Sequence, residues 1–123
     1  MLDYIISFGR GTTMGRVNYK GYTREDALIS VGSGWAQLIN RVFDKLASIK
    51  GTVKIVQVKE KFGGLRIYTD YGNVELDKVI HDVGIESVKT CEQCGIAGKI
   101  RGDSWYKTLC DTHANNSLTI NPV

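Results

Sequence analysis

The sequence predicts an α+β fold, in which amphipathic helices pack on a small antiparallel sheet and a C-terminal zinc ribbon or knuckle follows. Three observations predict this fold. Apolar residues recur at the helical period over residues 34–50. Segments rich in β-branched or alternating apolar residues follow at 52–59 and 65–70. Cysteine and histidine pairs at metal-ligand spacing then lie at 91–94 and 110–113.

Composition is that of a small globular protein. The 123 residues, 42% of them hydrophobic, suit a modest core that a metal would help to stabilise. We therefore predict an α+β core domain over 1–89, a zinc-ribbon unit over 90–114 and a flexible tail over 115–123. A net charge of +3 permits an anionic partner but is too small to require nucleic acid.

The cysteine pattern indicates a reducing compartment. All three cysteines have metal-ligand spacing, and an odd number argues against a disulfide framework. The N-terminal apolar run Tyr4-Ile5-Ile6 is too short for a signal peptide or a membrane span. We expect a cytoplasmic protein without a membrane partner.

The first elements are a hairpin and a short helix. Residues 3–8 and 17–22 have strand-like composition and flank a glycine-rich loop. Thr23 offers an N-cap, and Asp26 stands at the capping-box position. A short helix is therefore predicted from there to about Val31.

The clearest element is a helix over 34–50. Ser33 can cap it, and Gly51 stands where a left-handed residue would end it. Its apolar side chains form one continuous stripe, which must be buried against a sheet. The stripe consists of Trp35, Leu38, Ile39, Val42, Phe43, Leu46 and Ile49.

Two strands, 52–59 and 65–70, supply that sheet, with Gly63-Gly64 as the turn region. Alternation along the second strand places Leu65, Ile67 and Thr69 on one face. Arg66 and Tyr68 consequently lie on the other face.

A second helix begins near Asn73 or Val74, and acidic residues favour its N-terminus. Its apolar stripe contains Leu76, Val79, Ile80 and Val83. His81 lies beside this stripe, so we interpret it as a partly exposed helix residue rather than a catalytic base.

The metal motif is Cys91-x2-Cys94 followed by Cys110-x2-His113. Each pair lets two ligand atoms reach one ion, and four N/S ligands at a tetrahedral centre are what zinc prefers. The set leaves no position for water, so the predicted Zn²⁺ is structural. His113 is the least certain ligand, and Asp111 is the alternative.

Between the two metal pairs, 96–101 and 104–108 resemble the arms of a hairpin that turns at Gly102-Asp103. Trp105 and Tyr106 are adjacent on a strand, so their side chains point to opposite faces. The hairpin also carries cations, and together these residues suit either nucleic-acid contact or a plain structural role. The set comprises Lys99, Arg101, Trp105, Tyr106 and Lys107.

Cations and aromatic residues alternate around the central glycine turn. Lys59, Lys61 and Arg66 can neutralise phosphate, and Phe62 or Tyr68 can stack on a base. A β-hairpin with a solvated charged face explains the same pattern about equally well.

The loop 9–16 resembles a phosphate cradle only loosely. Arg10 and Arg16 flank its glycines and are candidate ligand contacts. However, no helix follows at once, and the Lys-Ser/Thr of a P-loop is missing. A structural hairpin loop is the favoured interpretation.

Enzymatic interpretations find little support in the residues. The His-x-Glu of zinc deaminases is absent upstream of the cysteine pair. With the three cysteines and His113 assigned to metal, His81 is the only histidine left for a catalytic set. The sequence therefore predicts a protein that is not an enzyme.

Four stretches carry a family resemblance: Gly34-Trp35, Val56–Tyr68 with its Lys-Glu-Lys-Phe-Gly-Gly-Leu-Arg string, Cys91–Gly95 and Trp105–His113. Over 33–114 they are similar to a family of small phage and prophage proteins with this string and a C-terminal zinc ribbon. The resemblance carries over only the zinc ligands. It implies a phage accessory protein, a class that commonly blocks host defences by binding nucleic acid, a host protein or a nucleotide signal.

The sequence therefore favours a non-enzymatic binding protein with structural zinc. The preferred ligand is a small anionic nucleotide, because the cations are local and the net charge is low. Long nucleic acid is the second hypothesis, and inhibition of a host protein is the third. The expected ligand contacts are Arg10, Arg16, Lys59, Lys61, Phe62, Arg66, Tyr68, Trp105 and Lys107.

Overall fold

A computed structural model describes the backbone of residues 16–120 and the side chains of residues 16–115. It is an α+β fold with a two-stranded antiparallel sheet, as the sequence predicts. The elements are, in order, α1 (Arg24–Ser30), the 3-10 turn η3 (Ser33–Trp35), α2 (Ala36–Ser48), β2 (Ile55–Lys61), β3 (Gly64–Thr69), α3 (Val74–Ser87), β4 (Lys99–Arg101), β5 (Lys107–Leu109) and α4 (Asp111–Ile120).

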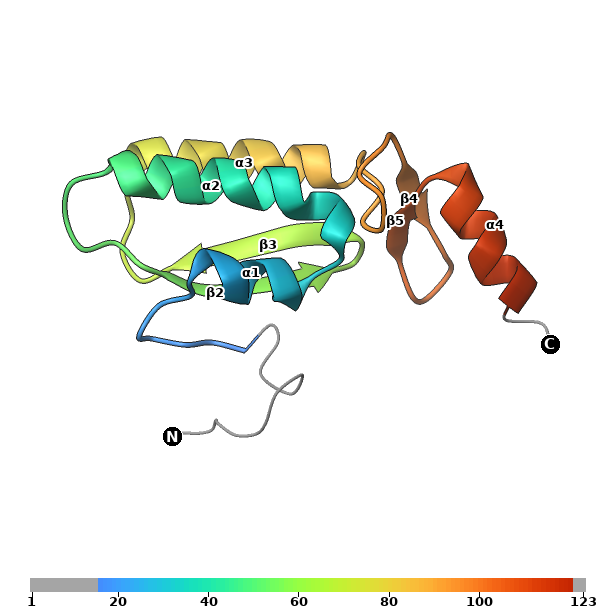
Figure 1. The fold of residues 1–123 in the computed structure, drawn as a ribbon, viewed down its shortest axis with the longest axis horizontal. Helices are drawn as coiled ribbons and strands as arrows, with labels where there is room; N and C mark the ends of the chain where they lie inside the picture. The colour runs from blue at the N-terminus through green and yellow to red at the C-terminus, as the bar shows by residue number, and fades with distance from the viewer. Residues whose placement is uncertain (1–15, 121–123) are drawn as a thin grey trace.

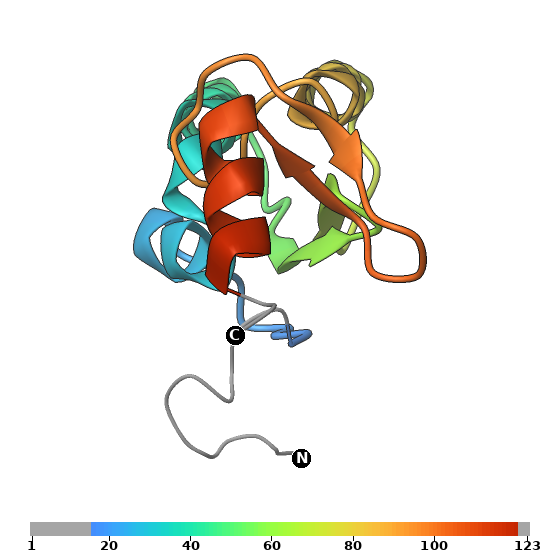
Figure 2. The same cartoon turned by 90° about the vertical axis from the view of Figure 1, so that its right-hand side faces the viewer.

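The main layer of helices lies on one face of the β2–β3 ribbon. Helices α2 and α3 run side by side over the ribbon, and α1 packs against α2 and β2 (Figure 1). The short β4–β5 hairpin and α4 form a second unit at one end of this sandwich (Figures 1 and 2). The predicted apolar stripes fill the core between the layers, which includes Ala27, Trp35, Leu38, Ile39, Val42, Phe43, Ile55, Val58, Leu65, Ile67, Leu76 and Val83.

One of the two predicted helix caps is confirmed. Thr23 and Asp26 form the expected capping box of α1. Helix α3 begins at Val74 as predicted, and the Asn73 side chain caps it by accepting a hydrogen bond from the Leu76 N–H. The other predicted cap is wrong, because Ser33 begins a 3-10 turn instead of capping α2. Its hydroxyl donates to the Gln93 carbonyl at 3.2 Å and so faces the C-terminal unit.

The ribbon turns one residue earlier than predicted. Lys61 pairs with Gly64, so Phe62 and Gly63 form a two-residue turn, and β2 continues to Lys61. Both turn residues have positive φ, +54° for Phe62 and +81° for Gly63, as a type I′ hairpin turn requires. The predicted faces are confirmed: Leu65 and Ile67 are buried, whereas Arg66 and Tyr68 are exposed.

The N-terminal hairpin is not confirmed. Residues 3–8 and Arg10 lie outside the described residues, and 17–22 forms an irregular segment with a turn rather than a strand. From this segment, the N–H groups of Asn18 and Tyr22 donate to the β2 carbonyls of Val56 and Ile55, at 2.7 and 2.6 Å.

Two further features concern the helices. The sequence did not predict α4, which begins beside the metal motif and continues to Ile120, into the predicted tail. No helix in the described part of the chain is long and apolar enough to cross a membrane.

Candidate metal centre and ligand-binding face

The four predicted metal ligands come together. The ligand atoms of Cys91, Cys94, Cys110 and His113 all lie within 4.8 Å of one another. The His113 Nδ1 is 3.5 Å from the Cys91 sulfur and 3.2 Å from that of Cys110, and the Cys94 and Cys110 sulfurs are 3.7 Å apart. Ligands about 2.0–2.3 Å from a tetrahedral ion would lie roughly 3.3–3.8 Å apart. The arrangement is therefore compatible with one bound metal ion.

Short-range backbone bonds position these ligands. The Gly95 N–H donates to the Cys91 carbonyl at 2.9 Å, and Gly95 has φ +85°, which closes the knuckle around the first pair. The second pair spans the start of α4, where the Ala114 N–H donates to the Cys110 carbonyl at 2.9 Å. This first helical turn brings His113 back toward Cys110.

Asp111 is excluded from the ligand cluster of the described residues. Its carboxylate instead accepts a hydrogen bond from Arg101 at 2.7 Å. That bond, together with the charge of Arg101, lowers the pKa of Asp111. The cluster of the described residues therefore contains His113 and not Asp111.

The surroundings favour a thiolate at Cys91. Burial raises the pKa of this thiol, but hydrogen bonds from the backbone of Cys110, Cys94 and Gln93 outweigh it and lower the pKa to about 6. For Cys94, a backbone hydrogen bond from Ile96 lowers the pKa, but burial and the neighbouring thiols raise it overall. Of these two thiols, Cys91 is therefore the more readily ionised.

A second group of predicted residues lies on the outer face of the β2–β3 ribbon, away from α2 and α3. We call this the basic face; it comprises Lys59, Lys61, Arg66 and Tyr68. Lys59 is directly opposite Arg66 in the strand register, and its ammonium lies 5.8 Å from the centre of the Tyr68 ring. Among the described residues, no carboxylate pairs with Lys59, Lys61 or Arg66.

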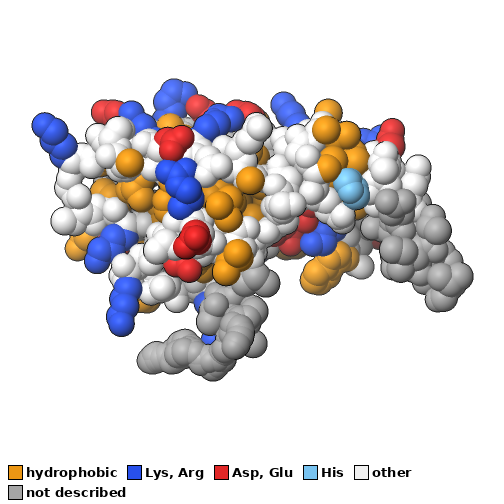
Figure 3. All heavy atoms as spheres, in the orientation of Figure 1, with side chains coloured by type: hydrophobic (Ala, Val, Ile, Leu, Met, Phe, Trp, Pro, Cys, Tyr) orange, Lys and Arg blue, Asp and Glu red, His pale blue; other side chains and the backbone are white. Residues whose placement is uncertain are grey.

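Exposed aromatic residues continue this surface at the turn. Phe62 is 60% exposed, and its ring meets Tyr106 edge-on with centroids 6.3 Å apart. The Lys61 ammonium lies 5.5 Å from the centre of the Phe62 ring. Trp105, next to Tyr106, is 75% exposed. Hydrophobic side chains are visible on this end of the molecule in Figure 3.

Lys107 has carboxylate partners, unlike the cations of the basic face. It is 3.3 Å from Glu92 and 3.8 Å from Glu60, so it belongs to a partly buried ion-pair network. Arg16 begins the described segment, and its carbonyl accepts a hydrogen bond from the Tyr22 hydroxyl. The structure thus brings together the ribbon residues of the prediction and gives Lys107 other partners.

Two features were missed by sequence reasoning. An open groove of about 430 Å³ lies between β3 and α3, where Arg66, Tyr68 and His81 contribute to its wall. Glu92 is only 5% exposed although it lies between two ligand cysteines. A glutamate in a Cys-x2-Cys loop gives no sequence signal of burial, because its partners are distant in the chain.

No family model, curated protein or solved structure matches this chain. The resemblance to small phage and prophage proteins therefore stays a prediction from the motifs. Function is accordingly inferred from the geometry of the metal centre and the basic face.

Proposed function

We propose that this chain is a non-enzymatic binding protein that holds a phosphate-bearing ligand on the basic face and is stabilised by structural zinc. The observation that carries the proposal is the directly opposed pair Lys59 and Arg66, which has no carboxylate partner among the described residues. Like charges opposite each other destabilise a strand pair. A phosphate between them would remove that repulsion and form charge-assisted hydrogen bonds.

Zinc is the metal that best suits the donor set. Three thiols and one imidazole are soft or borderline ligands, and atoms within 4.8 Å of one another are close enough to share one ion. All four positions are supplied by the protein, so no site is left at which the ion would bind water or substrate. Its role is to hold the C-terminal unit together.

A small nucleotide fits the basic face by its chemistry. The cations can take its phosphates, and the exposed Tyr68 ring beside Lys59 offers a flat surface for the base. Elsewhere many cations are neutralised by carboxylates, including Arg24, Arg41, Lys45, Lys78 and Arg101. The local excess of positive charge therefore favours a compact anion. By the family resemblance, this would be capture of a host nucleotide signal.

Single-stranded nucleic acid is the second candidate. It is favoured by the aromatic surface beyond the cations, where Phe62 and Tyr106 are in contact and Trp105 is exposed. Successive bases could stack on these rings while phosphates follow the lysines. Its affinity would fall steeply with salt, which a compact ligand with few phosphates would show less strongly.

The test is a thermal-shift screen of the zinc-loaded chain against mono-, di- and cyclic nucleotides and short DNA and RNA. A ligand at 100 times its Kd stabilises the folded state by about 2.7 kcal/mol. Lys59→Glu and Arg66→Glu should abolish the shift. Lys50→Glu, an exposed lysine after α2, is the matched control and should keep it. If no nucleotide or oligonucleotide shifts the wild type, the proposal is wrong, and a protein partner becomes the explanation for the aromatic surface.

A further inference from the structure

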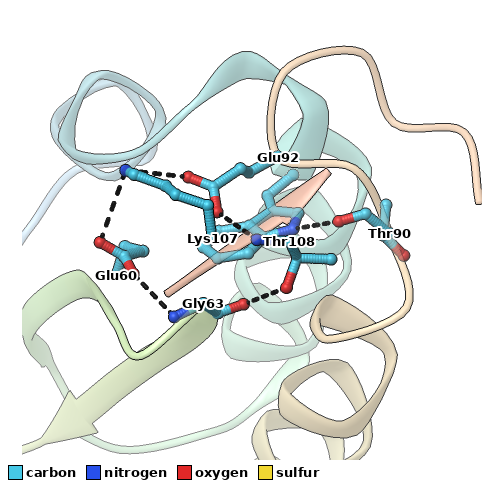
Figure 4. Close-up of polar contacts among 7 residues, drawn as sticks. Glu60, Gly63, Thr90, Glu92, Lys107 and Thr108 are labelled. Carbon is cyan, nitrogen blue, oxygen red and sulfur yellow. Dashed lines mark hydrogen bonds and ion pairs between the residues drawn. The ribbon is translucent and has the colours of Figure 1, made fainter. Parts of the chain in front are cut away.

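A buried polar network joins the metal knuckle to the turn of the ribbon (Figure 4). Two of its members come from the metal motif itself. Glu92 lies between the ligands Cys91 and Cys94, and Thr108 lies two residues before Cys110. Their exposed fractions are 5% and 0%, so the polar groups must find partners inside the protein.

Glu92 and Thr108 bond to each other, and Thr108 also bonds to the Phe62–Gly63 turn. The Thr108 N–H donates to the Glu92 carboxylate at 2.9 Å, and the Thr108 hydroxyl donates to the Gly63 carbonyl at 2.6 Å. On its other side, the Gly63 N–H donates to Glu60 at 2.8 Å. Lys107 lies between the Glu60 and Glu92 carboxylates (Figure 4). The metal unit, residues 90–114, therefore holds the turn directly.

The turn needs such support. Phe62 has φ +54°, a left-handed conformation that disfavours residues with a Cβ. Strained positions persist where surrounding contacts over-determine them. Strand β5 packs closely on the next residue, since a Cβ built on Gly63 would lie 3.2 Å from the Thr108 hydroxyl and 3.4 Å from the Lys107 carbonyl carbon. The metal unit thus helps to fix the residue that presents the exposed ring.

The metal unit has a small apolar core of its own. Among the described side chains, its buried apolar cluster consists of Cys91, Leu109, Cys110 and Ala114. Two of these are predicted metal ligands, so an ion would supply much of the unit's cohesion. Without the ion, we expect the segment that carries Thr108 and Glu92 to lose order and the turn to lose its outer support.

We propose that metal occupancy controls the ligand-binding face: the bound ion orders Glu92 and Thr108, and these fix the Phe62–Gly63 turn beside Lys61. The last step, from turn to ligand affinity, rests on the proposed function. The step from metal to turn does not, because it is measurable on the chain without ligand.

The experiment is amide hydrogen exchange of the full chain with Zn²⁺ and after chelation. We expect at least tenfold faster exchange at residues 62–64 after chelation, while α2 keeps its protection. Equal exchange at the turn in both states would overturn the proposal. It would equally be overturned if α2 and the turn lost protection together, since that means global unfolding rather than coupling.

Thr108→Val tests the connection in the presence of metal. The variant keeps the side-chain shape and the ligands but removes the hydroxyl that donates to Gly63. We expect Co²⁺ to bind with an unchanged absorption spectrum and the turn to exchange at least tenfold faster. Thr69→Val is the matched control, because its hydroxyl donates to the Tyr71 carbonyl at the far end of β3. Wild-type exchange in Thr108→Val would overturn the proposed route. A turn that responds to Zn²⁺ in a chain that binds no nucleotide would instead overturn only the proposed function.

Discussion

At the scale of single residues, Phe62 combines a backbone conformation that lowers stability with a side chain that is mostly exposed to solvent. An aromatic residue occupies a left-handed turn position and directs most of its ring to solvent. Asn-Gly is the preferred sequence for this turn type. Strain of this kind is often kept where function needs the side chain, which agrees with a ligand-contacting role for the ring.

Phe62→Asn should therefore stabilise the fold and weaken ligand binding. We expect the free energy of unfolding to rise by about 1 kcal/mol, because asparagine tolerates the left-handed region at a lower cost. Urea denaturation of the zinc-loaded chain measures this. A loss of stability would show that the contact between the Phe62 and Tyr106 rings outweighs the backbone strain.

Cys91 determines how the metal centre responds to pH. Its pKa in the folded state, about 6, lies well below that of a free thiol. The thiolate form is therefore stabilised by folding above the unfolded pKa, and this stabilisation is lost as pH falls through about 6. Because protons compete with the ion for each thiolate, the raised pKa of Cys94 makes Zn²⁺ affinity fall already at higher pH. We expect this decline to become steeper below pH 6, where Cys91 is protonated as well, as a fluorescent zinc indicator would report. An unchanged slope down to pH 5 would contradict the assignment of Cys91 as a ligand.

At the scale of elements, the metal unit docks on η3 through very close backbone contacts. The Gly34 N–H donates to the Glu92 carbonyl at 2.8 Å, and the Trp35 indole donates to the Thr90 carbonyl at 2.9 Å. A Cβ built on Gly34 would lie 2.0 Å from the Cys91 carbonyl oxygen. The glycine is required by this approach, because backbone atoms cannot move aside as a flexible side chain would.

Gly34→Ala should consequently separate the metal unit from η3. We expect a loss of more than about 3 kcal/mol in unfolding free energy, the range of severe overpacking and broken buried hydrogen bonds. Gly51→Ala is the comparison, since no atom lies within 4 Å of its built Cβ and only its φ of +119° opposes the change. Similar losses in both variants, measured by denaturation, would show that steric contact at Gly34 is unimportant.

A bidentate ion pair joins helices α2 and α3. Arg41 donates to both carboxylate oxygens of Glu86, at 2.8 and 2.7 Å, and this hydrogen bonding lowers the pKa of Glu86. Because the folded pKa is depressed, the stabilisation is present above the unfolded value of about 4.3 and is lost as pH falls below it. Exposed pairs contribute roughly 0.2–1 kcal/mol. Glu86→Gln should cost that much at pH 7 and nothing at pH 2.5, as denaturation at both pH values would show.

At the scale of the whole molecule, the features that depend on residues close together in the chain could be predicted from sequence patterns. The apolar period of α2, the alternation of β3, the Thr23 cap and the spacing of the metal ligands each reflect local geometry, and each is confirmed. The turn position, the 3-10 start at Ser33 and the burial of Glu92 depend on contacts between distant segments. No local pattern encodes these contacts, so they could not be predicted.

Removal of the metal tests how the whole molecule depends on its C-terminal unit. Chelation of Zn²⁺ should lower the unfolding enthalpy by roughly 0.7 kcal/mol for each residue of the C-terminal unit that loses its order, while the main core still unfolds cooperatively. Cys94→Ser should behave like the chelated wild type and should not respond to added Zn²⁺. Differential scanning calorimetry measures both, and an unchanged unfolding enthalpy after chelation would remove the case for structural zinc.

The order of the elements along the chain has a consequence for folding during synthesis. The helices and strands of the main core are complete at Ser87, before the first metal ligand. The docking bonds then connect residues far apart in sequence, such as Gly63 with Thr108 and Ser33 with Gln93. Their partners in the C-terminal unit are synthesised after the whole helical layer. The nascent chain can therefore assemble this layer first, and the proposed ion could bind only once the ribosome has added residue 113.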